Sequence, residues 1–426
     1  MSRPPITAQG DTDAPDTGPP PSLWCNRAFN LLWTGQCLSD LGGAMADLAL
    51  PLLVLQQTGS TARAGLVGTV GLAATTLCRL PSGVLADRCD RRRLMAVCDA
   101  LRIAAYAVLA AAVAAGAAPL PVVLAVVAGS AAATAVFSTT EHASIRTLVR
   151  ADQIADAVAR NEARSYGTSL AGPPLGGLLF GVGRSLPFLG NALSFLLSLV
   201  AVLCIRRPLQ GPRPGTERRP GTARSAAPAG ASLAEGVRFV LRHPFLRGLL
   251  LIAAPLNMAF TGMIFAMTLA LRRAGLSPFL IGLAGTIFAL GGFLGALAAP
   301  ALQRRLRLPT LITVLCWVTA VLMVVATLLS TGVLAAVPLA AAVFLGPTAN
   351  AALFGHQAAV TPDHLQGRVV SVLLLAAGSA AALAPALAGA LLARLSPGTA
   401  MLVFPLLVTV AAATATLGRV FRTMSP

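Results

Sequence analysis

Residues 83–93 read GVLADRCDRRR, and they separate two long apolar stretches of the chain. Within them a glycine is followed by an acid, and the acid by a cluster of arginines. A glycine lets two membrane helices approach closely, an acid can face the positive N-terminal end of a helix, and arginines gather on the cytoplasmic side of a bilayer. This spacing predicts a short cytoplasmic loop that joins two membrane-spanning helices.

The composition is also that of a membrane protein. Of the 426 residues 56% are hydrophobic and 11% are charged, and the mean hydropathy is +0.77. A soluble chain of this length needs more polar surface. The net charge of +17 follows a membrane-topology pattern, which we favour over nucleic-acid binding. The seven cysteines stand singly, so we expect no metal site, no disulfide framework and no cofactor.

Apolar blocks of about 20 residues, enough to cross a bilayer, alternate with arginine-rich breaks. We expect twelve membrane-spanning helices, near residues 28–55, 64–86, 94–116, 119–140, 160–182, 186–205, 246–271, 277–302, 308–329, 333–355, 367–393 and 398–419. With a cytoplasmic N-terminus, the outer loops hold only Arg63, Arg184, Arg272, Arg273 and Arg394. Positive residues favour the inner side, so we expect both termini to be cytoplasmic. All 32 basic residues are arginine, as in GC-rich bacterial genomes, and we expect the bacterial inner membrane.

A long polar break near the middle divides these spans into two groups of six. We expect a disordered cytoplasmic tail (1–26), an N-terminal six-helix half (27–205), a cytoplasmic linker with an amphipathic helix (206–245), a C-terminal six-helix half (246–420) and a cytoplasmic tail (421–426). The halves also resemble each other. Residues 60–70 align with 277–287 at an offset of 217, and Pro174 aligns with Pro385 at an offset of 211. A parallel repeat of two halves is therefore predicted.

The stretch 83–93 resembles the signature G-x-x-x-D-R-x-x-R-R-x of the major facilitator superfamily. Short patterns at 36–42, 58–60, 99–102, 242–244 and 367–369 are similar to those of its macrolide and siderophore (enterobactin-type) exporters, a drug:proton antiporter group. The resemblance implies an all-α membrane protein of the major facilitator fold, with 12 transmembrane helices in two six-helix halves and a substrate site between them.

The same resemblance implies a gate motif formed by Gly83, Asp87, Arg88, Asp90, Arg91 and Arg92. Asp87 would meet the start of the eleventh span, near Gly367 and Arg368, in one conformation and leave it in the other. The arginines can pair with Asp87 or Asp90. The alternative is a loop that only follows the positive-inside rule.

Residues 172–177 in the fifth span read GPPLGG and resemble the antiporter motif G-P-x-x-G-G of exporters in this superfamily. The motif residues are Gly172, Pro173, Pro174, Gly176 and Gly177. Proline bends a helix and glycine allows close packing. We expect Gly291 and Gly295 of the eighth span to provide the facing surface. A generic kinked helix is the alternative.

Asp40 and Asp47 stand seven residues apart in the first span, so both project from one side of a helix. Charged groups within a membrane are costly and tend to face a cavity. A carboxylate with little water around it binds a proton more readily than one in water. We expect at least one of the two to couple transport to protons or to bind a cationic substrate; a structural salt bridge is the alternative. The resembling exporters lead us to expect an acid at Gly43, which this chain lacks.

Other polar residues of the spans are given weaker roles. We expect Arg79, Asp99 and Arg102 to form an intracellular charge network that supports the gate. Glu141, His142, Glu162 and Arg164 are expected at the membrane interface. The fourth span lacks the internal arginine that other antiporter groups carry. Asn257 and Asn350 are candidates for lining a largely apolar cavity, or for hydrogen bonds between helices.

A nucleotide-binding loop of the form G-x-x-x-x-G-K-[ST] does not occur in the sequence, so ATP is not the expected energy source. We expect a monomeric, proton-driven exporter of a small amphipathic compound, such as an antibiotic, natural product or siderophore. Its partners would be this small molecule, protons and the lipid bilayer, without nucleic acid. An uptake carrier for a small nutrient, or a transport-dead sensor or scaffold, are the alternatives. We do not expect an enzyme.

Overall fold

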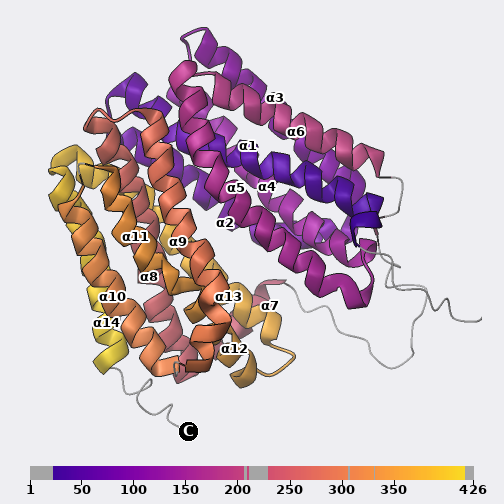
Figure 1. Cartoon of the computed structure of the whole chain (residues 1–426). Helices are drawn as coiled ribbons and strands as arrows, with labels where there is room; N and C mark the ends of the chain where they lie inside the picture. The colour runs from indigo at the N-terminus through magenta and orange to yellow at the C-terminus, as the bar shows by residue number, and fades with distance from the viewer. Residues whose placement is uncertain (1–22, 206–208, 211–228, 306–307, 331, 418–426) are drawn as a thin grey trace, which may run out of the picture.

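The computed structural model describes residues 23–205, 209–210, 229–305, 308–330 and 332–417 (Figure 1). The tail expected at 421–426, nearly all of the tail at 1–26 and the first part of the linker 206–245 lie outside these ranges. The first half contains the helices η1 (Leu23–Cys25), α1 (Arg27–Thr58), α2 (Thr61–Arg88), α3 (Arg91–Ala114), α4 (Leu120–Leu148), η2 (Ala151–Gln153), α5 (Ile154–Val182) and α6 (Leu186–Cys204).

The rest of the described chain is also helical. It contains α7 (Ala229–Arg242), α8 (Pro244–Arg273), α9 (Pro278–Arg305), α10 (Leu308–Leu328), η3 (Val333–Ala335), α11 (Ala336–Phe344), α12 (Gly346–Val360), α13 (Gln366–Arg394) and α14 (Pro397–Leu417). A helix therefore does lie in the predicted amphipathic part of the linker. There Val240 is fully buried while Leu241 remains exposed.

The predicted all-helical architecture is confirmed, and most of the twelve expected spans are long apolar helices. Within the described residues, ten helices are long and apolar enough to cross a membrane, with η3, α11 and α12 counted as one. α2 is an eleventh, bent by 51° between Arg79 and Pro81, where proline removes a backbone donor. α5, at the place of the remaining expected span, has 29 residues and packs along α1 and α9. The span expected at 333–355 is broken between α11 and α12, because Pro347 cannot donate to the carbonyl of Val343.

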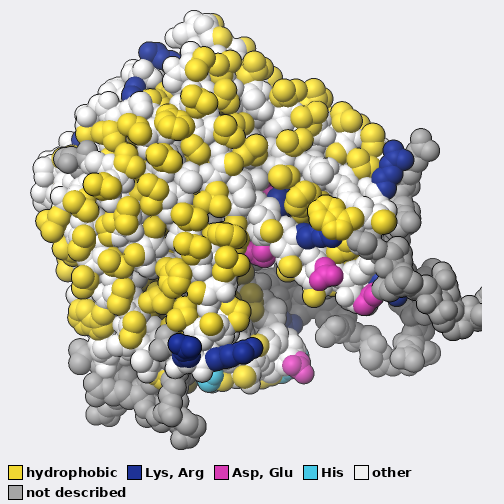
Figure 2. Space-filling model, viewed as in Figure 1, with side chains coloured by type: hydrophobic (Ala, Val, Ile, Leu, Met, Phe, Trp, Pro, Cys, Tyr) yellow, Lys and Arg dark blue, Asp and Glu magenta, His cyan; other side chains and the backbone are white. Residues whose placement is uncertain are grey.

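Apolar side chains cover the outside of this helical bundle. Figure 2 shows hydrophobic side chains spread over the visible sides of both halves, while charged side chains gather toward the ends and in the recess between the halves. Leu77, Leu297 and Leu328 are each more than 60% exposed. Exposed leucines on this scale would be unfavourable in water and are expected where helices face lipid.

The two halves are tilted bundles that meet through two helix pairs, α2 with α13 and α5 with α9 (Figure 1). Gly65 of α2 lies so close to Pro385 of α13 that a Cβ on it would collide with the proline carbonyl. In the same way, Gly282 of α9 lies against the carbonyl of Pro173 in α5. We call these contacts the α2–α13 seam and the α5–α9 seam.

Both seams lie at one end of the molecule, the end that contains Thr61 and Pro278; we call it the closed end. At the opposite end, a Cβ on Gly83 of α2 or on Gly367 of α13 would meet nothing within 4 Å. We call this the open end. The halves are therefore joined at the closed end and separated around these two glycines at the other.

The seams also correct the predicted repeat register. Gly65 and Gly282 differ by the expected 217 residues, but their partners Pro385 and Pro173 differ by 212. Pro173, and not Pro174, is therefore the structural counterpart of Pro385. Two apolar sequences can be aligned one residue out of register and still look similar. The glycine contacts identify the correct register.

Candidate functional site

One side of α1 carries both acidic residues of the first span. The helix begins where the Asn26 side chain accepts a hydrogen bond from the Phe29 N–H, and it ends at Gly59, whose φ of +65° favours glycine. Asp40 is 35% exposed through its side chain and Asp47 is exposed. Gly43 lies between them, and a Cβ there would meet nothing within 4 Å. This side of α1 is therefore left open by the helices that pack on the rest of it.

Asp40 belongs to a charge cluster that joins three helices. Nε of Arg164 in α5 lies 3.1 Å from Oδ2 of Asp40. Nη1 of the same arginine donates to Oε1 of Glu141 in α4 at 2.8 Å. Gln36, one turn before Asp40, donates from Nε2 to the other Glu141 oxygen at 3.2 Å. The three charged residues Asp40, Glu141 and Arg164 form a triad, and we call this triad together with Gln36 the triad cluster.

Glu141 and Arg164, which were expected at the membrane interface, are buried within the helical bundle. Their side chains are only 2% and 7% exposed, whereas His142 and Glu162 are exposed. α4 continues to Leu148 and α5 begins at Ile154, beyond the predicted ends at 140 and 160. These extra turns bring Glu141 and Arg164 inside the bundle. The sequence signal for this cluster was an acid, Glu141, and a base, Arg164, on two consecutive spans, together with Gln36 one turn before Asp40 in the first span.

Asp47 stands apart from the triad cluster. It lies two helical turns from Asp40 toward the closed end. The part of the chain that the structure describes gives its carboxylate no hydrogen bond or ion pair. α1 thus presents one shared carboxylate and one unpaired carboxylate to the same open space.

The expected network of Arg79, Asp99 and Arg102 is only partly formed. Asp99 and Arg102 pair within α3, and Ser198 of α6 donates to Asp99 Oδ2 at 2.9 Å. The Arg102 guanidinium lies over Phe137 and Phe195, with 4.6 and 4.2 Å to the ring centroids. Arg79 is exposed and does not join this pair, because α2 packs mainly on α4 and α13 and hardly on α3.

The loop of residues 83–93 is fastened to its own half. Asp90 caps α3 by accepting from the Arg93 N–H at 3.0 Å. Arg91 donates to the carbonyls of Ala143 and Leu209 at 3.0 and 3.1 Å, and Arg92 donates to the carbonyl of Leu203. Among the described residues these arginines form no ion pair with Asp87 or Asp90 in this conformation, and Arg91 and Arg92 bond to backbone carbonyls of α4, α6 and the following segment instead. Arg88 is exposed.

Asp87 and the start of α13 are apart in this conformation. Asp87 is exposed, and among the described residues it forms no ion pair. Arg368, the residue expected near it, pairs instead with Glu235 of α7. The gate contact predicted between Asp87 and α13 therefore remains a prediction for another conformation.

The glycines and prolines at 172–177 lie between α1 and the opposite half. Gly172 packs on Ala44 and Gly176 on Met45, so both face the helix that carries Asp40 and Asp47. Gly177 faces the other way, against Pro278 of α9. α5 is thereby wedged between the acidic helix and the C-terminal half.

The neighbour expected for this motif in α9 is wrong. Gly291 and Gly295 pack on Ala340 and Phe344 of α11, within their own half. The residues of α9 that face Pro173 are Gly282 and Gly285, nearer the start of the helix. Glycines three or four residues apart occur at both places, so spacing alone did not identify the pair.

The C-terminal half contributes few polar groups. Asn257 is exposed and donates to the Ala253 carbonyl of its own helix at 2.8 Å. Asn350 is exposed as well, at the end of α12 that follows the break. In the described part of the chain neither side chain forms a hydrogen bond to another helix. This fits a position lining a cavity better than a hydrogen bond between helices.

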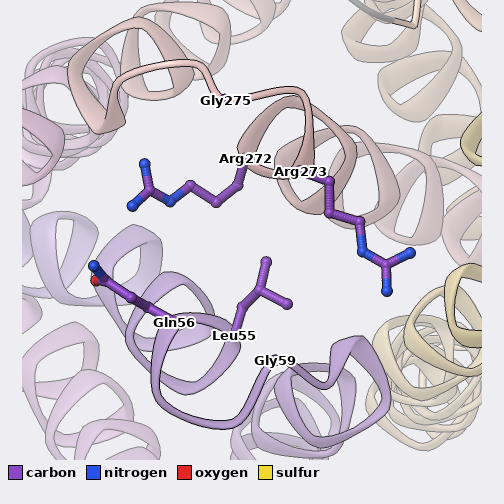
Figure 3. Close-up of a pocket in the computed structure, with 6 residues that line it drawn as sticks. All are labelled: Leu55, Gln56, Gly59, Arg272, Arg273 and Gly275. Atoms are coloured by element: carbon purple, nitrogen blue, oxygen red, sulfur yellow. The ribbon is translucent and has the colours of Figure 1, made fainter.

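A depression of about 440 Å³ marks the closed end, where α1 and α8 end (Figure 3). Its lining residues are Leu55, Gln56, Gly59, Arg272, Arg273 and Gly275. Figure 3 shows the Arg272 side chain turned toward the side of Gln56 and the Arg273 side chain turned away from the depression. Arg273 donates to the Leu392 carbonyl of α13 at 2.5 Å and to Thr61 Oγ1 of α2 at 3.4 Å. It therefore bridges the halves.

The sequence was compared with known families and proteins. The family model described as Major Facilitator Superfamily matches residues 32–385. The multidrug efflux pump Tap of Mycolicibacterium fortuitum is 30% identical over 367 residues, which cover 82% of this chain and 85% of Tap. Tap of Mycobacterium tuberculosis (strain H37Rv) is 30% identical over 376 residues, 85% of this chain and 86% of Tap.

Solved transporter structures share the fold. A bacterial homologue of the human lysosomal transporter Spinster, inward-facing and unoccupied, superimposes with a TM-score of 0.73 at 18% identity, covering 96% of this chain and all of its own. A bacterial homologue of the iron transporter ferroportin, in an inward-facing state, gives 0.68 at 19% identity and covers 94% of this chain and 99% of its own. At these identities the likeness concerns the fold alone.

Proposed function

The chain belongs to the major facilitator superfamily, and from this membership we propose that it is a proton-driven exporter of a small amphipathic organic compound, such as an antibiotic, natural product or siderophore. Members of the family are multi-pass membrane transporters of small molecules. The direction of transport, the coupling ion and the kind of substrate are the proposed parts.

Two observations support export. The relatives at 30% identity are multidrug efflux pumps. The motif at 172–177, which resembles that of exporters, lies in the α5–α9 seam and touches α1 as well. A motif placed there can influence both the acidic helix and the contact between the halves.

The arrangement of the halves supports alternating access. We place the open end on the cytoplasmic side, because most arginines of the connections lie there and positive residues favour that side. Both termini are then cytoplasmic, in the inner membrane of a bacterium. A substrate enters the space between the halves from the cytoplasm and leaves after the closed end has opened. Asp87 would meet the start of α13 in that second conformation, as the gate motif implies.

The observation that carries the coupling proposal is the acidic, open side of α1. Asp40 is 35% exposed through its side chain and Asp47 is exposed, both on the side of α1 that other helices leave open. The opposite half is nearly free of acids, since Asp363 is the single Asp or Glu between residues 246 and 420. Ionisable groups within a membrane tend to serve protons or substrate. Apolar walls with Asn257 and Asn350 would suit the body of an amphipathic compound.

Inside-out membrane vesicles provide the test, because their lumen corresponds to the cell exterior. Respiration acidifies the lumen, and ethidium serves as a fluorescent amphipathic probe. We expect ethidium to accumulate only while the pH gradient persists. Asp40→Asn should reduce this accumulation to the level seen without a gradient, whereas Asp363→Asn, an exposed acid near the open end, should leave it unchanged.

Other results would support the alternatives. Gradient-driven accumulation in right-side-out vesicles, but not in inside-out ones, would favour an uptake carrier with the same fold. Binding of ethidium without flux in either preparation would favour a sensor or scaffold. We further propose a monomer that needs no cofactor and no nucleic acid, which mass measurement of the purified protein in detergent can test.

A further inference from the structure

The triad cluster contains one cation for two carboxylates, and the two carboxylates differ. Glu141 is 2% exposed and accepts from both Arg164 and Gln36. Asp40 is 35% exposed and is held by Arg164 alone. Water and protons can therefore reach Asp40, while Glu141 is enclosed and fully bonded.

We propose that Arg164 is a positioning residue shared between a permanent partner, Glu141, and a releasable partner, Asp40, so that one proton on Asp40 frees α1 from α5. This inference rests on the proposed proton coupling and specifies the groups that perform it. The sequence did not assign either Arg164 or Glu141 to the site.

Charge balance gives the direction. With Asp40 ionised, the two carboxylates and one guanidinium carry a net charge of −1. When Asp40 takes up a proton, its carboxylate becomes a neutral carboxylic acid and the remaining Arg164–Glu141 pair is neutral. Arg164 stays protonated throughout, since a guanidinium does not release its proton in proteins. The α1–α5 link can then open without leaving an unpaired charge inside the membrane.

The position of Arg164 on α5 lets this release affect the contact between the two halves. Arg164 precedes Gly172 by eight residues, which is about 12 Å along the helix at about 1.5 Å per residue. α1 and α5 are held by the Asp40–Arg164 ion pair and, further toward the closed end, by Gly172 on Ala44. Gly177 of α5 then rests on Pro278 of the opposite half. Loosening the ion pair therefore alters the helix that forms the α5–α9 seam.

Other charged or titratable groups act on Asp40 and must be held constant in a test. They are Arg102 of α3, His142 of α4 and, one turn away on α1 itself, Cys37. α6 faces α1 with the uncharged side chains of Asn191 and Ser194 near Gly42. None of these groups is changed in the variants below.

Trp33 offers a native probe of the α1–α5 contact that needs no substrate. Its indole N–H donates to the Arg160 carbonyl of α5 at 3.2 Å, one turn before Arg164. The chain has three tryptophans, so Trp24→Phe and Trp317→Phe leave Trp33 as the sole emitter. We expect its emission in the purified full-length protein to change with pH in one transition, and we expect Asp40→Asn to abolish that transition.

Glu141→Gln and Arg164→Gln should move this transition in opposite directions. Without the charge of Glu141, Arg164 holds ionised Asp40 more strongly, so the midpoint shifts to lower pH by about one unit. Without Arg164, Asp40 keeps its proton to higher pH, and the midpoint rises by about one unit. A purely structural role would not produce opposite shifts. Ser198→Ala, which removes a hydrogen bond from the separate Asp99–Arg102 pair, should leave the midpoint unchanged.

Shifts in the same direction, no shift, or a transition that survives Asp40→Asn would each overturn the inference. If Arg164→Gln does not fold, Arg164→Lys replaces it with a smaller upward shift, because a lysine ammonium cannot bridge two carboxylates as a guanidinium does. Failure of this inference is distinguishable from a failure of the proposed export. If the protein does not export ethidium, the vesicle measurement is negative, but the midpoint of the Trp33 emission transition still shifts in opposite directions in the two variants.

Discussion

The α2–α13 seam and the α5–α9 seam are built alike but bonded in opposite ways. Each packs a glycine on a proline carbonyl, Gly65 on Pro385 and Gly282 on Pro173. Each also has a threonine hydroxyl at the same position of the repeat that bonds across the halves. Thr69 accepts from the Ala386 N–H at 2.9 Å, whereas its counterpart Thr286 donates to the Leu170 carbonyl at 2.7 Å.

The second proline of the motif explains the reversal. In the register of 212 residues, Pro174 stands where α13 has Ala386. Proline has no N–H to offer to a threonine, and it also leaves the carbonyl of Leu170, four residues earlier, without its helical donor. Thr286 supplies that donor. A difference of one residue thus turns the hydroxyl from acceptor to donor.

Among the residues that the structure describes, the α2–α13 seam has a second polar contact that the other seam lacks. Thr61 is fully buried and donates to the Gly389 carbonyl at 2.9 Å, and Arg273 reaches the same hydroxyl. The counterpart of Thr61 in α9 is Pro278, which has no hydroxyl. We infer that opening of the closed end breaks more hydrogen bonds at the α2–α13 seam, while the α5–α9 seam is held chiefly by packing.

The largest effects should come from filling the shared glycine positions. Gly65→Ala and Gly282→Ala each place a Cβ against a proline carbonyl, and overpacking of this kind costs about 1–3 kcal/mol. Both should shift the protein toward an opened closed end, by about fivefold or more. Distances between spin labels at Gln56 and Ala274, in a variant without native cysteines, would report the shift.

Gly181→Ala is the matched control, because a Cβ there meets nothing within 4 Å. If only one of the two seam variants changes the label distance, the likeness of the seams does not extend to their energetics.

The next largest effect tests the reversed hydrogen bond. Thr286→Val leaves the partly buried Leu170 carbonyl without a donor, which costs about 1–2 kcal/mol. Thr69→Val should cost less, because the Ala386 N–H can return to a carbonyl of its own helix. Thermal melting in detergent should rank the two variants in this order.

Pro174→Ala sharpens the same test. It restores the N–H at position 174, so the Leu170 carbonyl regains a helical donor. Thr286→Val in this background should then lower the melting temperature much less than it does alone. Equal losses with and without the proline would contradict the role assigned to Pro174.

Much of the fold could be predicted from the sequence, because hydropathy and arginine placement act over whole spans. The depth of single charges could not. Glu141 stands just outside the apolar block at 119–140, and Arg164 stands near the start of the block at 160–182, but α4 ends later and α5 begins earlier than these blocks. Helix ends are determined by capping and packing rather than by hydropathy, so the triad cluster remained hidden. Asp40 was found because it lies well inside an apolar block.

Contacts between helices were the second limit. The glycines at 291 and 295 have the spacing of a packing surface, and so do those at 282 and 285 with their neighbours. Only the arrangement in space shows that α11 takes the former and α5 the latter. The gate motif has a related difficulty, since the partner of Asp87 depends on which end of the molecule is closed.

A smaller effect is expected at Thr61, the contact without a counterpart. Thr61→Val removes the hydrogen bond to Gly389, which costs about 1 kcal/mol and changes the ratio of conformations about fivefold. The labels at Gln56 and Ala274 should separate more often. Thr75→Val is the control, because the Thr75 hydroxyl donates to the Gly71 carbonyl within its own helix.

The smallest effect should distinguish the two adjacent arginines at the depression in Figure 3. Arg273→Gln loses contacts with Leu392 and Thr61, but the side chain is exposed, so we expect a cost of about 0.5 kcal/mol, roughly a twofold change. Arg272→Gln should change less, because within the described part of the chain Arg272 donates to the Leu276 carbonyl of its own connection and to no other group. Label distances that respond equally to both would indicate that the local charge, and not the bridge to α2 and α13, keeps this end closed.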